Sequence, residues 1–191
     1  MRQFEAFVLR TLDIVFSLSG LLILWPVLLI LCILGWFDTR SPLYLQERVG
    51  RYQRLFVLVK FRTMHPGTAS VASHLASNNS ITALGGILRR TKLDELPQLW
   101  NVLLGEMSLV GPRPGLINQV ELTHARVAHG VYDARPGITG LSQVNGIDMS
   151  TPELLAQTDA LMLREMSVTN YFRFIVLTVL GKGTGDAVSR E

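Results

Sequence analysis

The chain has 191 residues with 18 basic and 15 acidic side chains, and its formal net charge is +3 when the histidines are neutral. This length predicts one domain with a hydrophobic core, and the single cysteine, Cys32, excludes an intrachain disulfide. The mild positive charge suits an anionic membrane surface or nucleotide substrates, but the sequence has no RNA-binding signature, zinc-finger spacing or basic helix, so nucleic acid is not expected as a partner.

The first element is an apolar segment. Residues 14–37 form a run of 24 residues without a charge. As a helix this run would be about 36 Å long, which exceeds the roughly 30 Å of a bilayer's hydrocarbon core. Asp13 precedes it and no small-residue cleavage pattern follows it, so the run indicates a membrane segment rather than a signal peptide.

Pro26 divides this segment near its middle, and two topologies fit that position. A single proline is typical of a kinked helix that spans the membrane. Arginines lie on both flanks, however, including Arg2 and Arg10 before the run and Arg40 and Arg48 after it. Because basic flanks stay on the cytoplasmic side, this pattern also fits a re-entrant helix, but on the residues alone the kinked spanning helix remains the favoured topology.

Residues 42–63 then predict two short strands around a turn at Gly50 and Arg51. Lys60 and Arg62 occupy alternate positions near the end of the second strand and therefore point to the same face. A solvated strand face and a phosphate-binding face are equally consistent with this pair. Residues 65–80 predict a surface loop, because they are rich in Ser, Ala and Asn and poor in large apolar groups.

Residues 91–114 carry the most informative pattern. Asp94 and Glu95 precede Pro97, and apolar residues then recur at helical spacing, so we expect both acids at the N-terminal end of a helix. Taken alone, they would be an N-cap and a first-turn acid. Cations surround them, however: Arg89, Arg90 and Lys92 lie one turn earlier, and Arg113 follows in a Gly-Pro-Arg-Pro segment. Clustered cations beside two carboxylates are typical of a site that binds a diphosphate with a divalent metal.

The remaining chain predicts helices over residues 83–90, 116–128 and 152–165. Residues 134–146 are rich in glycine and add side-chain donors from Arg135, Gln143 and Asn145. The apolar residues 169–182 are too few to span a bilayer, and they suit either the membrane interface or the protein core. The four histidines have no metal-ligand spacing, so zinc is not expected.

Three motifs together resemble the bacterial sugar transferase family, the small monotopic polyprenyl-phosphate phosphoglycosyl transferases. They are Lys-Phe-Arg-Thr-Met at residues 60–64, the block at 91–114, and the glycine-rich segment from Arg135 to Gly146. The resemblance implies a mostly helical α+β fold with a small β-hairpin and amphipathic interfacial helices around a compact catalytic domain. It also implies a re-entrant membrane helix broken at Pro26 within residues 1–38, and a catalytic domain at residues 39–191 on the cytoplasmic face of the bacterial inner membrane.

The family resemblance further implies transfer of a phospho-sugar from a UDP-sugar to undecaprenyl phosphate, giving a polyprenyl diphosphate sugar and UMP. This reaction begins a bacterial glycan such as O-antigen, capsule, exopolysaccharide or glycoprotein. Asp94 would be the nucleophile that forms an aspartyl phospho-sugar intermediate, and Glu95 would act as a base or help Asp94 to bind Mg2+. Arg89 and Arg113 match family positions near the phosphates, and Lys60, Arg62, Arg135, Gln143 and Asn145 are the further substrate contacts that we expect.

The chain departs from the family pattern at several positions. Trp25 stands where Ser usually precedes the proline, and Leu141, Ile147 and residues 161–162 also differ. The sugar carried, the glycan pathway and a homodimer are left open. The rival functions are a metal-dependent phosphatase or nucleotide-sugar hydrolase that uses the same two acids with water as acceptor, and a catalytically silent membrane scaffold.

Overall fold

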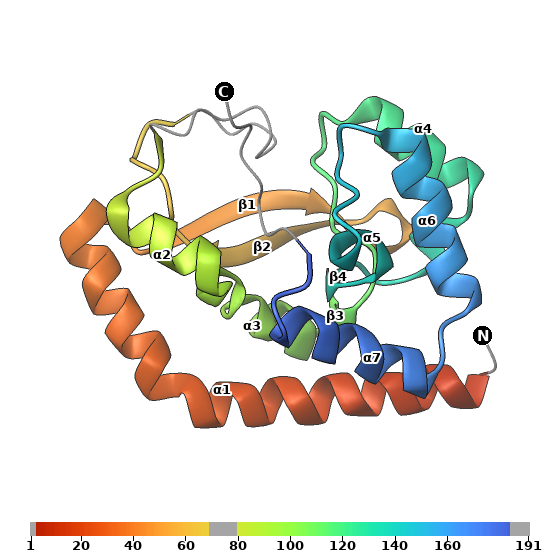
Figure 1. The fold of residues 1–191 in the computed structure, drawn as a ribbon, viewed down its shortest axis with the longest axis horizontal. Helices are drawn as coiled ribbons and strands as arrows, with labels where there is room; N and C mark the ends of the chain where they lie inside the picture. The colour runs from red at the N-terminus through yellow and green to blue at the C-terminus, as the bar shows by residue number, and fades with distance from the viewer. Residues whose placement is uncertain (1–2, 69–79, 184–191) are drawn as a thin grey trace.

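The computed structural model describes residues 3–68 and 80–183, and most of the expected loop at 65–80 lies outside them. The fold is mostly helical, with a two-stranded antiparallel hairpin and a short parallel strand pair (Figure 1). The longer helices are α1 (Gln3–Thr39), α2 (Ala83–Thr91), α3 (Gln98–Leu104), α4 (Val120–Ala128), α6 (Pro152–Arg164) and α7 (Val168–Val179). The strands are β1 (Leu43–Val49), β2 (Leu55–Phe61), β3 (Ser108–Val110) and β4 (Gly137–Thr139). Short turns are η1 (Arg51–Gln53), η4 (Leu93–Glu95), η5 (Val131–Asp133) and the four-residue helix α5 (Leu141–Val144).

Most of the predicted elements are confirmed. The hairpin pairs β1 with β2 around η1, and its register places Tyr44 opposite Lys60. The helices predicted at residues 83–90 and 152–165 are α2 and α6, whereas the helix predicted from residue 116 begins only at Val120. The sequence did not predict the pairing of β3 with β4, in which Ser108 lies opposite Gly137.

Helix α1 is continuous through Pro26, and Figure 1 shows a pronounced bend in it. The predicted break is therefore a bend within one helix. A proline removes one backbone hydrogen bond and its ring pushes away the preceding turn, which accounts for the bend. The helix is long and apolar enough to cross a membrane, with a mean hydropathy of 2.6, and only 11% of its most apolar window is buried.

Both halves of α1 are fixed to the same compact body. In the first half, the buried carboxylate of Asp13 accepts hydrogen bonds from Ser108 Oγ at 3.0 Å, Leu109 N at 2.9 Å and the Tyr171 hydroxyl at 2.9 Å. In the second half, Leu31 packs in a cluster with residues of β2 and α2. Residues on both sides of Pro26 therefore contact one domain.

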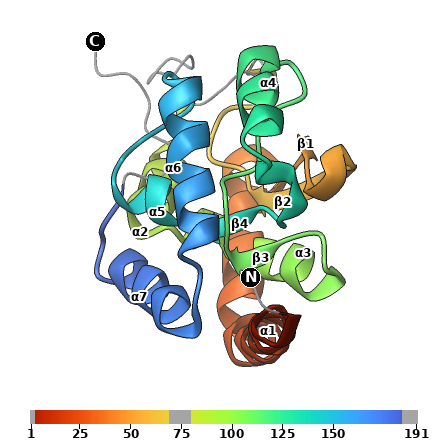
Figure 2. The same cartoon turned by 90° about the vertical axis from the view of Figure 1, so that its right-hand side faces the viewer.

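The helices lie on two sides of the strands. Figures 1 and 2 show α3 and α7 beside the first half of α1, and α4 and α6 on the far side of the molecule from it. Large apolar side chains are exposed on α1, α3 and α7, among them Ile23, Trp100 and Val176. The apolar C-terminal residues have two environments: Tyr171 and Phe174 of α7 are buried, while Val176 is exposed.

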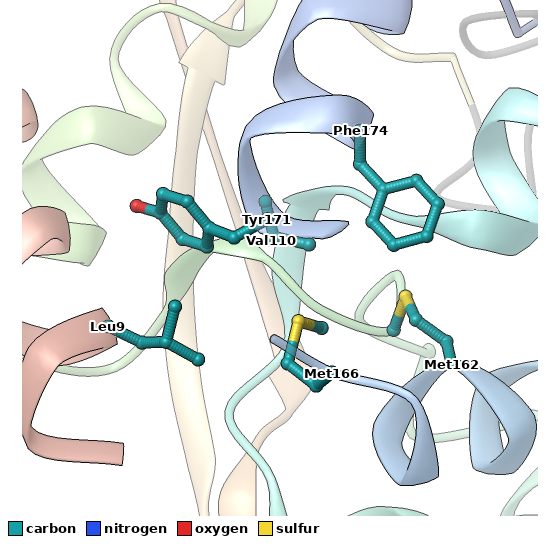
Figure 3. Packing of buried hydrophobic residues seen from close by; sticks show 6 residues of the cluster. All are labelled: Leu9, Val110, Met162, Met166, Tyr171 and Phe174. Atoms are coloured by element: carbon teal, nitrogen blue, oxygen red, sulfur yellow. The ribbon is translucent and has the colours of Figure 1, made fainter. Parts of the chain in front are cut away.

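The main hydrophobic core joins four elements. Figure 3 shows Leu9 of α1, Val110 of β3, Met162 of α6, Met166, and Tyr171 and Phe174 of α7 packed around one point. A second cluster lies between the hairpin and α3, and a third joins Leu31, Phe61 and Leu88. Because Val110 at the end of β3 packs in the main core, it fixes the position at which the following segment begins.

Candidate functional site

One wall of the candidate site is the inner face of the hairpin. Lys60 and Arg62 both line a small cavity of about 50 Å³, which confirms that they share a face. Lys60 is only 8% exposed, and its Nζ lies 5.8 Å from the ring centre of Tyr44. The guanidinium of Arg62 lies 5.2 Å from the same ring, and its Nε donates to the carbonyl of Ser41 at 2.9 Å. The hairpin thus fixes two cations at this cavity.

Arg89 reaches the same cavity from α2. Its Nε donates to Thr63 Oγ1 at 2.8 Å, just beyond the end of β2. Gly85 allows this approach, because a Cβ there would lie 2.1 Å from the carbonyl oxygen of Thr63. Arg89 follows Gly85 by four residues, so it lies one turn further along the same helix face. The close contact of α2 with Thr63 therefore positions Arg89.

Asp94 and Glu95 lie in η4, a single 3-10 turn ahead of α3. The residue before this turn, Lys92, ends α2 in the left-handed conformation with φ of 56° and sends the chain in a new direction. Pro97, and not Asp94, caps α3, so the interpretation of Asp94 as the N-cap of that helix is wrong. Asp94 is only 3% exposed. Helix capping therefore does not explain why this side chain is buried.

Arg113 joins this turn from a distant segment. Its Nη2 lies 3.1 Å from Glu95 Oε1, and the two side chains are 25% and 12% exposed. Burial lowers the pKa of Lys92, the nearby Glu95 carboxylate raises it, and the Arg113 guanidinium lowers it further. Lys92, Glu95 and Arg113 thus share one electrostatic environment beside Asp94.

The Gly-Pro-Arg-Pro segment at residues 111–114 is held through its four carbonyl oxygens. Their donors come from four different parts of the chain, and they are Gln143 Nε2 to Gly111 at 3.3 Å, Gly137 N to Pro112 at 2.8 Å, Arg126 Nη1 to Arg113 at 2.8 Å, and Arg48 Nη1 to Pro114 at 3.0 Å. Gly137 also passes so close that a Cβ there would lie 2.0 Å from the Gly111 nitrogen. This backbone therefore presents Arg113 in a fixed position.

Arg135 lies apart from these residues. Its Nε donates to the carbonyl of Gly105 at 2.8 Å, and Gly105 ends α3 whereas Asp94 precedes it. A seven-residue helix is about 10 Å long, so this contact is at the opposite end of α3 from the two acids. Arg135 lines a second cavity, and its predicted contact with the same phosphates is not supported by this position.

The two remaining predicted donors, Gln143 and Asn145, lie in different surroundings. Gln143 bonds to Gly111, so it supports the segment that carries Arg113. Asn145 is exposed at the end of α5. The structure thus brings Lys60, Arg62 and Arg89 together at one cavity and pairs Glu95 with Arg113, while Asn145 stays at the surface.

Several residues that support the site were not predicted. Gln46 and Arg48 of β1 line the hairpin cavity, and Arg48 Nη2 donates to Gln46 Oε1 at 2.6 Å. Their alternate spacing, like that of Lys60 and Arg62, was a usable signal. The pair of Arg126 with Asp159 is also new, and its members lie 33 residues apart with no local pattern that joins them.

The donor set fits one mode of Mg2+ binding. Among the described residues, no group of three or more His, Cys, Asp or Glu side chains could hold a metal ion. Asp94 and Glu95 supply two adjacent carboxylates, and Mg2+ is often bound by one or two carboxylates together with substrate phosphates and water. The residues therefore fit a metal that arrives with a diphosphate.

Comparison with known proteins gives one consistent result. The family model for bacterial sugar transferases matches residues 4–183. The chain is 36% identical over 190 residues to the UDP-galactose-lipid carrier transferase of Erwinia amylovora, covering 91% of this chain and 40% of that protein. It is 40% identical over 162 residues to the undecaprenyl-phosphate galactose phosphotransferase of Salmonella typhimurium, covering 76% and 34%. It is 37% identical over 186 residues to the UDP-glucose:undecaprenyl-phosphate glucose-1-phosphate transferase of Xanthomonas campestris pv. campestris, covering 90% and 38%. The chain thus spans 34% to 40% of the length of these three relatives.

Proposed function

The chain belongs to the bacterial sugar transferase family, and from that premise we propose that it transfers a phospho-sugar from a UDP-sugar to undecaprenyl phosphate. The products are a polyprenyl diphosphate sugar and UMP. The printed names of the relatives from Salmonella typhimurium and Xanthomonas campestris pv. campestris support this class of reaction. One of these names specifies galactose and the other UDP-glucose, at similar identity to this chain, so UDP-galactose and UDP-glucose are the first donors to test.

The observation that carries the proposal is the position of Asp94. It is a buried carboxylate in a turn whose next residue, Glu95, pairs with Arg113 at 3.1 Å. A carboxylate that attacks a diphosphate meets like-charge repulsion, which fixed guanidinium groups reduce. Arg113 and Arg89 are two such groups, and both guanidinium groups already donate hydrogen bonds, to Glu95 and to Thr63 respectively, before any substrate arrives.

The reaction proceeds in two displacements at the same phosphorus. An oxygen of Asp94 attacks the sugar-bearing phosphorus of the UDP-sugar, the bond from that phosphorus to the bridging oxygen breaks, and UMP leaves. An oxygen of undecaprenyl phosphate then attacks this phosphorus, and the bond to Asp94 breaks to restore the carboxylate. Mg2+ held by Asp94 and Glu95 would supply further neutralisation of the diphosphate charge.

Helix α1 is the membrane segment in this proposal, and it enters and leaves on one side. A spanning helix would place its ends on opposite faces, about 30 Å apart. Here Asp13 near one end and Leu31 near the other both contact the same domain. Ile23 and Trp25, near the bend, are 73% and 60% exposed. These contacts support our proposal that residues 1–38 are the re-entrant part and that residues 39–191 are the catalytic domain on the cytoplasmic face of the inner membrane.

The test is nucleotide release from a panel of UDP-sugars by the detergent-purified chain, with Mg2+ and with or without undecaprenyl phosphate. Asp94→Asn is compared with Glu121→Gln, which makes the same acid-to-amide change at an exposed position of α4. Without lipid, we expect the parent and Glu121→Gln to release at most one UMP per protein molecule, because the intermediate then has no acceptor; with lipid, we expect continued turnover, and Asp94→Asn should release none. UDP release would mean ordinary glycosyl transfer, and continued UMP release without lipid would mean a hydrolase. Full activity of Asp94→Asn would disprove its role as nucleophile.

A further inference from the structure

A second cavity lies between the first half of α1, β3 and the residues around η5. Its volume is about 320 Å³. Side chains from α1, η1, the residues around η5 and the end of α6 line it, and the charged members are Arg10, Asp13, Arg51, Asp133 and Arg135. None of its lining residues lines the hairpin cavity that holds Lys60 and Arg89.

Three guanidinium groups are fixed around this cavity by backbone carbonyls. Arg10 Nη1 donates to Val102 O at 2.8 Å, Arg51 Nε donates to Asp133 O at 2.8 Å, and Arg135 Nε donates to Gly105 O at 2.8 Å. A guanidinium has five N–H donors. Among the described residues, Arg51 and Arg135 each give hydrogen bonds through Nε alone, so their terminal nitrogens are available to an acceptor in the cavity.

The cavity has an excess of positive charge. Burial lowers the pKa of Arg135, and the neighbouring guanidinium groups of Arg10 and Arg51 lower it further. Of the two acids, Asp13 accepts hydrogen bonds from Ser108, Leu109 and Tyr171 through Oδ1, with its Oδ2 4.0 Å from Arg10 Nη1, while Asp133 is exposed. Three cations against two acids leave a net positive charge that suits an anion.

The other walls are apolar and adjoin the membrane segment. Ala6 and Leu9 of α1 face the cavity together with Leu163 and Met166. Phe7 on the same helix is 71% exposed, and a helix is about 10 Å across with its side chains. The cavity therefore lies about one helix diameter from a surface that would contact lipid.

From the three fixed arginines, the apolar walls and the contact with α1, we propose that this cavity binds the phosphate of an anionic phospholipid headgroup. Arg51 and Arg135 donate to the phosphate oxygens, and the apolar walls contact the start of an acyl chain. The site is distinct from the one at Asp94, since Arg135 is bound at the opposite end of α3. The proposal does not depend on phospho-sugar transfer, because binding is measured without a UDP-sugar.

The experiment is native mass spectrometry of the full chain in neutral detergent, titrated with phosphatidylglycerol or phosphatidylcholine. We expect saturable binding of phosphatidylglycerol and no comparable binding of phosphatidylcholine. Arg51→Gln and Arg135→Gln should each weaken the phosphatidylglycerol affinity about tenfold, as expected for one lost charge-assisted contact. Arg51→Lys should retain more of it. Arg54→Gln removes the same charge from an exposed position two residues beyond Tyr52 and outside the cavity lining, and it should have no effect.

Two results would overturn the proposal. Equal weakening by Arg51→Gln and Arg54→Gln would mean that lipid binds to the surface charge in general. If glycerol 3-phosphate displaced phosphatidylglycerol at equal concentration, the ligand would be a soluble phosphate and not a lipid. Comparing thermal unfolding of each variant with the parent separates loss of binding from loss of fold.

Discussion

The most informative perturbation is the replacement of Asp159 by asparagine. Asp159 is fully buried, and its Oδ2 accepts from Arg126 Nε at 3.1 Å and Nη2 at 2.7 Å, while its Oδ1 accepts from Ser142 Oγ at 2.7 Å. Burial raises the pKa of Asp159, and the Arg126 guanidinium opposes that shift. Asp159→Asn keeps the shape of the side chain but leaves the Arg126 charge buried without its counter-ion.

Removing one partner of a buried ion pair costs about 3–5 kcal/mol. For a chain of this length, 1 kcal/mol lowers the melting temperature by about 2–4 °C, so Asp159→Asn should lower it by about 6–20 °C. The assay is thermal unfolding in lipid nanodiscs. The matched control is Glu153→Gln on the same helix, because Glu153 pairs with His129 at 2.9 Å but is exposed, and its melting temperature should be unchanged.

A second variant separates stability from positioning. Arg126→Met combined with Asp159→Asn leaves neither charge buried alone, so it should melt above Asp159→Asn. It also removes the donor to the carbonyl of Arg113. A misplacement of about 1 Å at a reacting site can cost roughly a hundredfold in rate, so transfer should stay low although stability recovers. If Asp159→Asn melts within 2 °C of the parent, or the double variant is both stable and fully active, the reasoning is wrong.

Three further predictions concern the site and α1. Arg113→Lys should lower the rate of UMP release by about tenfold to a hundredfold with an unchanged melting temperature, since an ammonium cannot replace the guanidinium fork, and an equal rate would contradict this role. Asp13→Ala should cost about 2–4 kcal/mol in thermal unfolding because it removes the acceptor of three hydrogen bonds, and no loss would refute it. In a Cys32→Ser background, Phe4→Cys and Asp38→Cys should both react with a thiol reagent only from the cytoplasmic side, whereas labelling from opposite sides would establish a spanning helix.

Elements with a local pattern could be predicted from the sequence. Alternation along residues 42–63 predicted the hairpin, and helical spacing predicted α2 and α6. The pairing of β3 with β4 could not be predicted, because three-residue strands carry almost no alternation and 26 residues separate Val110 from Gly137. Their contact depends on the close approach of two glycines, Gly111 and Gly137, which only the folded chain reveals.

In the candidate site, too, local sequence patterns predicted some features, while others depend on how distant segments pack. The sequence grouped the acids with Arg113 because unlike charges gather there, and in the structure one of the two acids, Glu95, pairs with Arg113. Arg135 was expected at the same site from its glycine-rich surroundings, but its direction depends on a carbonyl at the end of α3. The partner of a buried charge such as Asp159 depends on how α4 and α6 pack, which no local spacing encodes.

The bonds to residues 111–114 are unequal in importance. The Gln143 bond to Gly111 is the longest at 3.3 Å, and Gly111 is held independently because its nitrogen donates to Thr139 O at 2.8 Å. Gln143→Ala should therefore change turnover little. Arg113 has its carbonyl bonded to Arg126, whose side chain is buried and fixed in turn by Asp159. We therefore expect turnover to be more sensitive to mutations along this buried path into α4 and α6 than to mutations that are merely close to Asp94. Measuring turnover and melting temperature for variants of these residues would test this expectation.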